Sequence, residues 1–209
     1  MARYTGPTCR LCRHLNEKLM LKGEKCVTSK CPLQKRGGPT RQFRTRRRLK
    51  ISEYRLQLQE KQKARYTYGV LERQFRKLFN EAEKHPGITD ENLIQLLERR
   101  LDNVVYRLGF ASSRSQARQV VRHGHIALNG RKTDIPSCLV KPGDTIAWRE
   151  EKAKTELYKL VVEEIQGKEG PSWLALDKEK VSGRVIAIPN ADEVNVNFSG
   201  KAIVEYYSR

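Results

Sequence analysis

Acidic residues are scarce in this sequence. It has 24 Asp and Glu residues against 42 Lys and Arg residues, so its formal net charge is +18. An excess of this size indicates a polyanionic partner. The net charge is +15 over residues 1–65, +5 over residues 66–149 and −2 over residues 150–209. The first part therefore suits a phosphate backbone, whereas the last part is better suited to a protein partner.

Long apolar runs are also missing. None approaches the roughly 18–20 apolar residues that a membrane-spanning helix needs. The N-terminus has no apolar stretch of the secretory type. The basic residues do not form one amphipathic helix with a bulky apolar face, which disfavours a membrane surface. We therefore expect a cytoplasmic protein with reduced cysteines and no membrane partner.

Catalytic motifs are absent as well. The sequence has no Walker A loop, no G-x-G-x-x-G, no G-x-S-x-G and no H-E-x-x-H. The isolated carboxylates Asp102, Asp134 and Asp144 are explained as a partner at the start of a helix and as turn formers. We therefore predict a protein that is not an enzyme.

Four cysteines near the start form two close pairs. Cys9 and Cys12 are spaced C-x2-C, and Cys26 and Cys31 are spaced C-x4-C. Four thiolates in such pairs can surround one Zn²⁺ tetrahedrally. Few apolar residues lie between them, and metal binding supplies on the order of ten kcal/mol in zinc-finger peptides. We expect one structural Zn²⁺ in a basic zinc-knuckle arm over residues 1–45, with disulfides, an iron–sulfur cluster or idle thiols as alternatives.

The end of this arm is strongly basic. Residues 35–50 read KRGGPTRQFRTRRRLK, and the Gly and Pro residues disfavour a helix. Like charges also repel one another. We expect this segment to be flexible when free and ordered on RNA.

Two helices are predicted next. Ser52 can cap a helix that runs to about Tyr66 and offers Arg55, Lys61 and Arg65 on its outer face. A second helix spans residues 70–84, with an apolar face at steps of three and four. Residues 46–92 are therefore predicted to form a helical platform domain.

Residues 93–189 have the pattern of a small α+β module. Apolar residues at steps of three and four predict one helix from Leu93 to Leu108. A second helix opens at Ser113, with Gln116 at capping-box spacing, and ends at Gly124. Strands are predicted at 125–128, 131–133, 135–140, 145–148, 173–176 and 184–188, with a type I′ turn at Asn129-Gly130 and a helix at 151–166. The module thus has two helices and a small mixed or antiparallel sheet.

Arginines recur on both helices of the module. Arg99, Asn103 and Arg107 form one row, and Arg114, Arg118 and Arg122 form another that we expect to face outward. No acidic residue occurs between Ser112 and Arg131. A solvated helix face is the alternative, but such faces usually mix signs, so the rows favour phosphate binding. The corner at His123 and His125 can hydrogen-bond RNA or simply pack.

The sequence of this module also resembles that of a known family. The segment RLDNVVYRLGFASSRSQARQVVRHGHIALNGR, residues 100–131, resembles the S-four RNA-binding module of the bacterial small-subunit ribosomal protein four family. The similarity continues in MARYTGPTCRLCR, YGVLERQFRKLF and IVEYYSR, and is weaker from about residue 150 to 201. Some members of this family carry the cysteines, so the resemblance is to the zinc-cysteine-containing form.

The resemblance has several implications. It implies a ribosome-bound, structural constituent of the small subunit that binds small-subunit ribosomal RNA early, nucleates assembly and contributes to translational accuracy. It implies contacts with the neighbouring small-subunit protein five and with messenger RNA where it enters, the chain being a monomer within the ribosome. It also implies that the module is inserted into the platform domain, which residues 190–209 rejoin. In some bacteria the family also represses translation of its own messenger.

Three other functions remain as alternatives. S-four modules also occur in RNA-modifying enzymes, but these need a further catalytic domain, and only 60 residues follow Arg149. An RNA-binding translational regulator could use the same module. A small zinc-knuckle DNA regulator is weakened by the lack of a recognition helix with mixed Asn, Gln and Arg.

The pattern and the resemblance together give a set of basic, polar and aromatic candidates for RNA binding. They are Arg3, Arg10, Arg13, Arg44, Arg46, Arg47, Arg48, Lys50, Arg55, Lys61, Arg65, Tyr68, Arg73, Arg99, Arg100, Asn103, Arg107, Ser113, Arg114, Gln116, Arg118, Arg122, His123, His125, Asn129 and Arg131.

Overall fold

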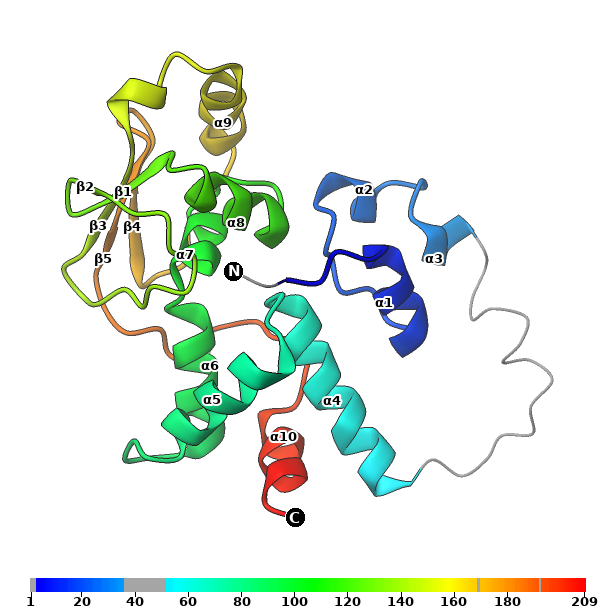
Figure 1. Cartoon of the computed structure of the whole chain (residues 1–209). Coiled ribbons are helices and arrows are strands. Elements are labelled where there is room, and N and C mark those ends of the chain that lie inside the picture. Colours follow the sequence, from blue (N-terminus) through cyan, green and yellow to red (C-terminus); the bar gives the residue numbers. More distant parts are fainter. Residues whose placement is uncertain (1–2, 36–51, 169, 192) are drawn as a thin grey trace. The chain divides into compact units, whose positions relative to one another are not determined.

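The computed structural model describes residues 3–35, 52–168, 170–191 and 193–209 (Figure 1). The chain divides into two compact units, Met1–Ile94 with Asn195–Arg209, and Gln95–Val194. The segment predicted to be flexible when free, residues 35–50, lies outside the described residues except for Lys35.

Three short helices open the first unit. They are α1 (Thr8–Leu15), α2 (Glu24–Val27) and α3 (Pro32–Lys35). Little apolar surface is buried here: Leu19 and three of the cysteines, Cys12, Cys26 and Cys31, are the buried apolar side chains of residues 3–34. So small a core gives this segment little hydrophobic stabilisation of its own.

Two longer helices and the chain end complete the first unit. Helix α4 (Glu53–Thr67) begins as predicted after Ser52, whose Oγ accepts a hydrogen bond from the Arg55 N–H at 3.4 Å. Helix α5 (Glu72–Ala82) buries Phe75 and Phe79. The C-terminal helix α10 (Gly200–Tyr207) lies beside α4 in Figure 1. Its Tyr207 ring lies 4.5 Å from that of Phe79, so the last residues form part of this core.

The single helix predicted from Leu93 to Leu108 is wrong. The structure has two helices, α6 (Thr89–Glu98) and α7 (Leu101–Arg107), because Arg100 between them is extended at φ −66° and ψ 134°. The Leu101 N–H donates to the carbonyl of Cys138 at 2.8 Å, so the interrupted backbone bonds to a distant segment. The apolar period continues across the break since both helices bury their leucines, and the period alone could not locate it.

The second unit contains a five-stranded sheet. The strands are β1 (Ile126–Leu128), β2 (Arg131–Lys132), β3 (Thr145–Trp148), β4 (Leu174–Asp177) and β5 (Ser182–Val185). Their order is β2-β1-β3-β5-β4, and every pairing is antiparallel. The predicted α+β class with a small antiparallel sheet is confirmed.

The predicted strand at residues 135–140 did not form. This segment contributes one isolated bridge, between Leu139 and Arg100. Pro136 has no N–H to give to a strand ladder, which explains the irregular backbone. The turn at Asn129-Gly130 is confirmed, with positive φ at both residues (51° and 76°), as a type I′ turn requires.

One apolar core fills this unit. Helices α7, α8 (Arg114–Arg122) and α9 (Glu156–Gln166) pack against one face of the sheet, with Ile146, Trp148 and Val185 turned inward. A 3₁₀ turn, η2 (Glu150–Lys152), precedes α9. None of the described helices has both the length and the apolar character needed to cross a membrane.

Candidate nucleic-acid interface

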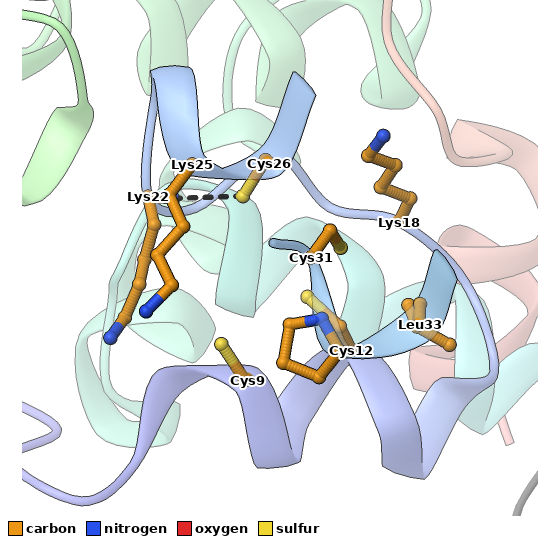
Figure 2. Close-up of a pocket in the computed structure, with 9 residues that line it drawn as sticks. Cys9, Cys12, Lys18, Lys22, Lys25, Cys26, Cys31 and Leu33 are labelled. Carbon is orange, nitrogen blue, oxygen red and sulfur yellow. Dashed lines mark hydrogen bonds between the residues drawn. The ribbon is translucent and has the colours of Figure 1, made fainter. Parts of the chain in front are cut away.

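Figure 2 shows one pocket in the first unit, lined by all four cysteines of the predicted zinc site, namely Cys9, Cys12, Cys26 and Cys31. The Lys22 backbone N–H donates to Cys26 Sγ at 3.3 Å. Burial raises the pKa of the Cys12 thiol, a backbone hydrogen bond at Leu19 partly offsets this, and the other three thiols raise the pKa further. Among the described residues, however, no group of three or more His, Cys, Asp or Glu side chains is placed so that it could hold a metal ion. The zinc ion therefore stays a prediction.

The predicted RNA-binding residues differ widely in exposure. Five of them, Arg44, Arg46, Arg47, Arg48 and Lys50, lie outside the described residues. The exposed ones are Arg3, Arg10, Arg55, Arg73, Arg122, His123, Asn129 and Arg131. The half-buried ones are Arg13, Arg65, Arg99, Arg107, Arg114, Gln116 and His125. The buried ones are Lys61, Tyr68, Arg100, Asn103, Ser113 and Arg118.

The placement of Lys61 on an outer face is wrong. Its side chain is buried under α10, with Nζ 2.7 Å from Glu72 Oε1 and 4.5 Å from the centre of the Tyr206 ring. Burial would raise the pKa of Glu72, but hydrogen bonds from Lys61 and Tyr207 outweigh it and lower that pKa. Tyr68, the aromatic candidate for RNA binding, is buried edge-on against Phe198. Both side chains hold α10 and its preceding segment against α4 and α5.

The outward position expected for Arg118 is also wrong. Arg118 is 9% exposed, and its Nη1 lies 3.1 Å from Asp102 Oδ2. The same carboxylate, 3% exposed, receives Nε and Nη2 of Arg100 at 3.1 and 2.9 Å. Two guanidiniums thus share one buried carboxylate, which sequence reasoning had explained only as a partner at a helix start.

A second buried carboxylate was missed altogether. Glu98 is fully buried and accepts two hydrogen bonds from Arg107, Nε to Oε2 at 2.9 Å and Nη2 to Oε1 at 2.8 Å. Asn103, placed in a row with Arg99 and Arg107 by its spacing, is buried and donates to Glu98 Oε2 at 2.8 Å. Its own Oδ1 accepts from Arg114 Nε at 2.7 Å. The sequence holds no simple signal for this cluster, because Glu98 and Arg107 are nine residues apart and meet only through the break at Arg100.

Three polar candidates have local structural partners. Ser113 Oγ accepts from the Gln116 N–H at 3.3 Å, and Gln116 Oε1 accepts from the Ser112 N–H at 3.0 Å, so both start α8. Asn129 donates to Asp144 Oδ1 and accepts from the Thr145 N–H, both at 2.8 Å. These bonds account for the side chains without RNA.

The histidine corner is partly packed. The His125 ring lies 5.3 Å from that of Trp148 and 6.3 Å from that of His123. Burial lowers the pKa of His125, and the nearby positive charges of Lys152, His123 and Arg149 lower it further. The neutral ring therefore predominates near pH 7.

Several exposed cations have no internal counter-charge. Arg3, Arg10, Arg55, Arg73 and Arg131 are exposed and form no ion pair with any residue that the structure describes. Arg122 lies 3.5 Å from Asp134, but both side chains are about half exposed, and such a pair is weak. Exposed, unneutralised guanidiniums of this kind match phosphate oxygens in geometry and charge.

Comparison with family models gives two matches. Residues 3–98 match the ribosomal protein S4/S9 N-terminal domain, and residues 99–146 match the S4 domain. The boundary between them falls at the break between α6 and α7.

Whole-chain relatives agree with these matches. The chain is 54% identical to the small ribosomal subunit protein uS4 of a Thermoanaerobacter species, 53% to that of Heliobacterium modesticaldum and 50% to that of Dehalococcoides mccartyi. Each alignment covers all 209 residues and the full length of the relative. The chain therefore belongs to the uS4 family of small ribosomal subunit proteins.

Proposed function

We propose that this chain, a non-enzymatic structural constituent of the small ribosomal subunit, recognises the shape of folded small-subunit ribosomal RNA. In this mechanism exposed guanidiniums span phosphates on converging RNA helices. Neutralising those phosphates reduces the repulsion between the RNA helices and fixes the angles between them. The chain works in the cytoplasm, bound to the ribosome.

The observation that carries this proposal is the set of exposed arginines that form no ion pair with a described residue or, in the case of Arg122, only a weak exposed one. A net charge of +18 adds a long-range attraction to any polyanion. Ion-paired or buried arginines such as Arg118 serve the fold first. We therefore assign the main phosphate contacts to Arg3, Arg10, Arg55, Arg73, Arg122 and Arg131, together with the basic residues 41–50.

We propose finer roles on the same basis. Early binding would nucleate assembly of the subunit and support translational accuracy. The two compact units would act as domains, with the sheet module inserted into the helical one. The chain would be a monomer within the ribosome, next to small-subunit protein five and to messenger RNA where it enters. Residues 150–209, with a net charge of −2, suit the protein contact better than RNA.

RNA binding is tested by titrating deproteinised small-subunit ribosomal RNA with the full chain at several salt concentrations. The double variant Arg122→Ala/Arg131→Ala should lower the log–log salt slope by about two units, roughly one for each lost phosphate contact. Lys159→Ala is the matched control, because Lys159 is exposed on α9 and paired with Glu156. Equal retention of unrelated duplex DNA by the wild-type chain would overturn the proposal.

We further propose that Cys9, Cys12, Cys26 and Cys31 hold one Zn²⁺. Support comes from their common pocket and from the N–H···S bond to Cys26. Four thiolates leave no open position for a reacting water, so the ion would stabilise the arm and would not act in catalysis. Binding would draw the four sulfur atoms together.

Elemental analysis of the purified chain tests this site. One zinc per chain is expected, lost in Cys26→Ser and retained in Cys138→Ser, a cysteine far along the chain in the second unit. The helicity of residues 8–35 should fall when the metal is removed. Iron in place of zinc, or a wild-type chain without metal, would contradict the proposal.

A further inference from the structure

The structure assigns a positioning role to the buried carboxylate of Glu98: we propose that it orients Arg107 and Arg114 for contact with an RNA phosphate. This inference rests on the proposed RNA-binding function. It extends that function to a residue of the opposite charge, which is not among the basic, polar and aromatic candidates named above.

Glu98 fixes the geometry of the Arg107 guanidinium. Glu98 is fully buried and holds Arg107 by two parallel N–H···O bonds of 2.9 and 2.8 Å. Such a bidentate pair fixes the plane of the guanidinium as well as its position. The Arg107 side chain nevertheless stays 24% exposed. Because the bidentate pair already restricts the Arg107 side chain, less conformational entropy is lost when that side chain contacts a phosphate.

Glu98 also orients Arg114, through the side chain of Asn103. Glu98 Oε2 and the Glu98 carbonyl oxygen each accept a hydrogen bond from Asn103 Nδ2, at 2.8 and 3.0 Å. This orients Asn103 so that its Oδ1 faces Arg114 Nε at 2.7 Å. The Arg114 guanidinium also lies 4.6 Å from the centre of the Tyr106 ring. Glu98 therefore positions both guanidiniums, one directly and one through Asn103.

The charges around Glu98 also favour phosphate binding. Two guanidiniums accompany one carboxylate, so positive charges outnumber negative ones among these three side chains. The negative charge is fully buried, whereas the arginine side chains are 24% and 17% exposed. A phosphate approaching from solvent therefore meets the cations first, and the cluster attracts it.

The neighbouring carboxylate provides a matched comparison. Asp102 also holds two guanidiniums, but those of Arg100 and Arg118 are buried with it. That cluster contributes to the fold and presents little cationic surface. The two carboxylates, four residues apart, should therefore differ in their effects on RNA binding.

The test compares Glu98→Gln with Asp102→Asn in the full chain, using deproteinised small-subunit ribosomal RNA at several salt concentrations. Glu98→Gln should lower the log–log salt slope by about one to two units and weaken binding at each concentration. Asp102→Asn should leave the salt slope of the folded protein unchanged. Thermal unfolding measures separately what fraction of that variant is folded. Glu163→Gln on the exposed face of α9 controls for the loss of one negative charge elsewhere.

A second variant keeps the test decisive if Glu98→Gln does not fold. Arg107→Lys retains the positive charge but cannot form the bidentate pair, so it should lower the RNA affinity of the folded chain, with the folded fraction measured by thermal unfolding. Where Glu98→Gln folds, the double variant can be measured as well. There Arg107→Lys should weaken RNA binding by less than it does alone, because the two residues act through one contact.

The outcomes separate the inference from the function on which it rests. Tighter RNA binding by Glu98→Gln would mean that the carboxylate only neutralises the arginines, and would overturn the inference. An unchanged slope in Glu98→Gln, or unchanged affinity in Arg107→Lys, would do the same while wild-type binding stands. Failure of the wild-type chain to retain the RNA would instead overturn the proposed function.

Discussion

Arginines of the same helix have different surroundings in this protein. Arg118 and Arg122 lie one turn apart on α8, yet Arg118 is buried against Asp102 and Arg122 is exposed beside Asp134. Removing a charge from water costs several kcal/mol, so Arg118 depends on its partner. Arg122 stays hydrated whether or not its partner is present.

Asp102→Asn should therefore destabilise the protein strongly. It removes the full negative charge beside the buried Arg100 guanidinium, and the loss of one partner from a buried pair costs about 3–5 kcal/mol. Denaturant unfolding measures this change. Asp134→Asn is the control and should cost about 0–1 kcal/mol, because its pair with Arg122 is exposed. Equal effects of the two substitutions would contradict the assignment of a buried cluster.

His125 should make stability depend on pH. Its folded-state pKa is lowered from 6.5, first by burial and then by nearby positive charges. A lowered pKa contributes stability that is present above about pH 6.5 and is lost as the pH falls through the folded-state value. His125→Gln should reduce the fall in unfolding free energy between about pH 7 and pH 5. Denaturant unfolding at a series of pH values checks this, and parallel curves for the two proteins would rule it out.

In the second unit, strand β5 and helix α7 pack at very close distance. Strand β5 lies so near α7 that a Cβ on Gly183 would overlap the Cδ atoms of Leu108. Leu108 is itself buried at the end of α7 and has little room to move. The absence of a side chain at one residue therefore sets the separation of a strand and a helix.

Gly183→Ala should destabilise the second unit by about 1–3 kcal/mol, the usual cost of overpacking a core. Gly167→Ala is the control, because a Cβ there meets nothing within 4 Å. Thermal unfolding should separate the two variants. Adding Leu108→Ala to Gly183→Ala should cost less than the separate effects predict, since the smaller side chain makes room. Strict additivity would show that the two residues do not interact.

At the scale of the whole molecule, the C-terminal helix α10 returns to pack in the first unit. Helix α10 contributes Tyr207 to the core of the first unit, where its hydroxyl donates to Glu72 at 2.9 Å. Gln57 on α4 donates to Glu205 at 2.8 Å. Segments about 150 residues apart in sequence thus belong to one compact unit.

Deleting residues 199–209 should therefore affect the two units unequally. Amide exchange should become faster in α4 and α5, which lose their packing partner, and should stay slow in the sheet. Tyr207→Ala is a milder version that should cost about 2–4 kcal/mol, within the range for large aromatic truncations after allowance for partial exposure. Uniform loss of protection across the chain would contradict the division into two units.

Much of the local structure could be read from short stretches of sequence. The caps at Ser52 and Ser113 and the turn at Asn129-Gly130 were predicted correctly, because each depends on a few adjacent residues. The break at Arg100 could not be predicted, since the lost helical bonds are replaced by bonds to residues 136–140. Likewise, Lys61 is buried only because α10 returns to cover it.

The sequence by itself determined the sign and size of the charge, the residue types available for RNA, the cysteine pairs and the local start of most helices. These properties depend on composition and on neighbours within a few residues. Tertiary structure alone decided which cations face solvent and which are held by Glu98 and Asp102. Solvent access depends on which distant segments pack over a side chain, and that is settled only when the chain folds.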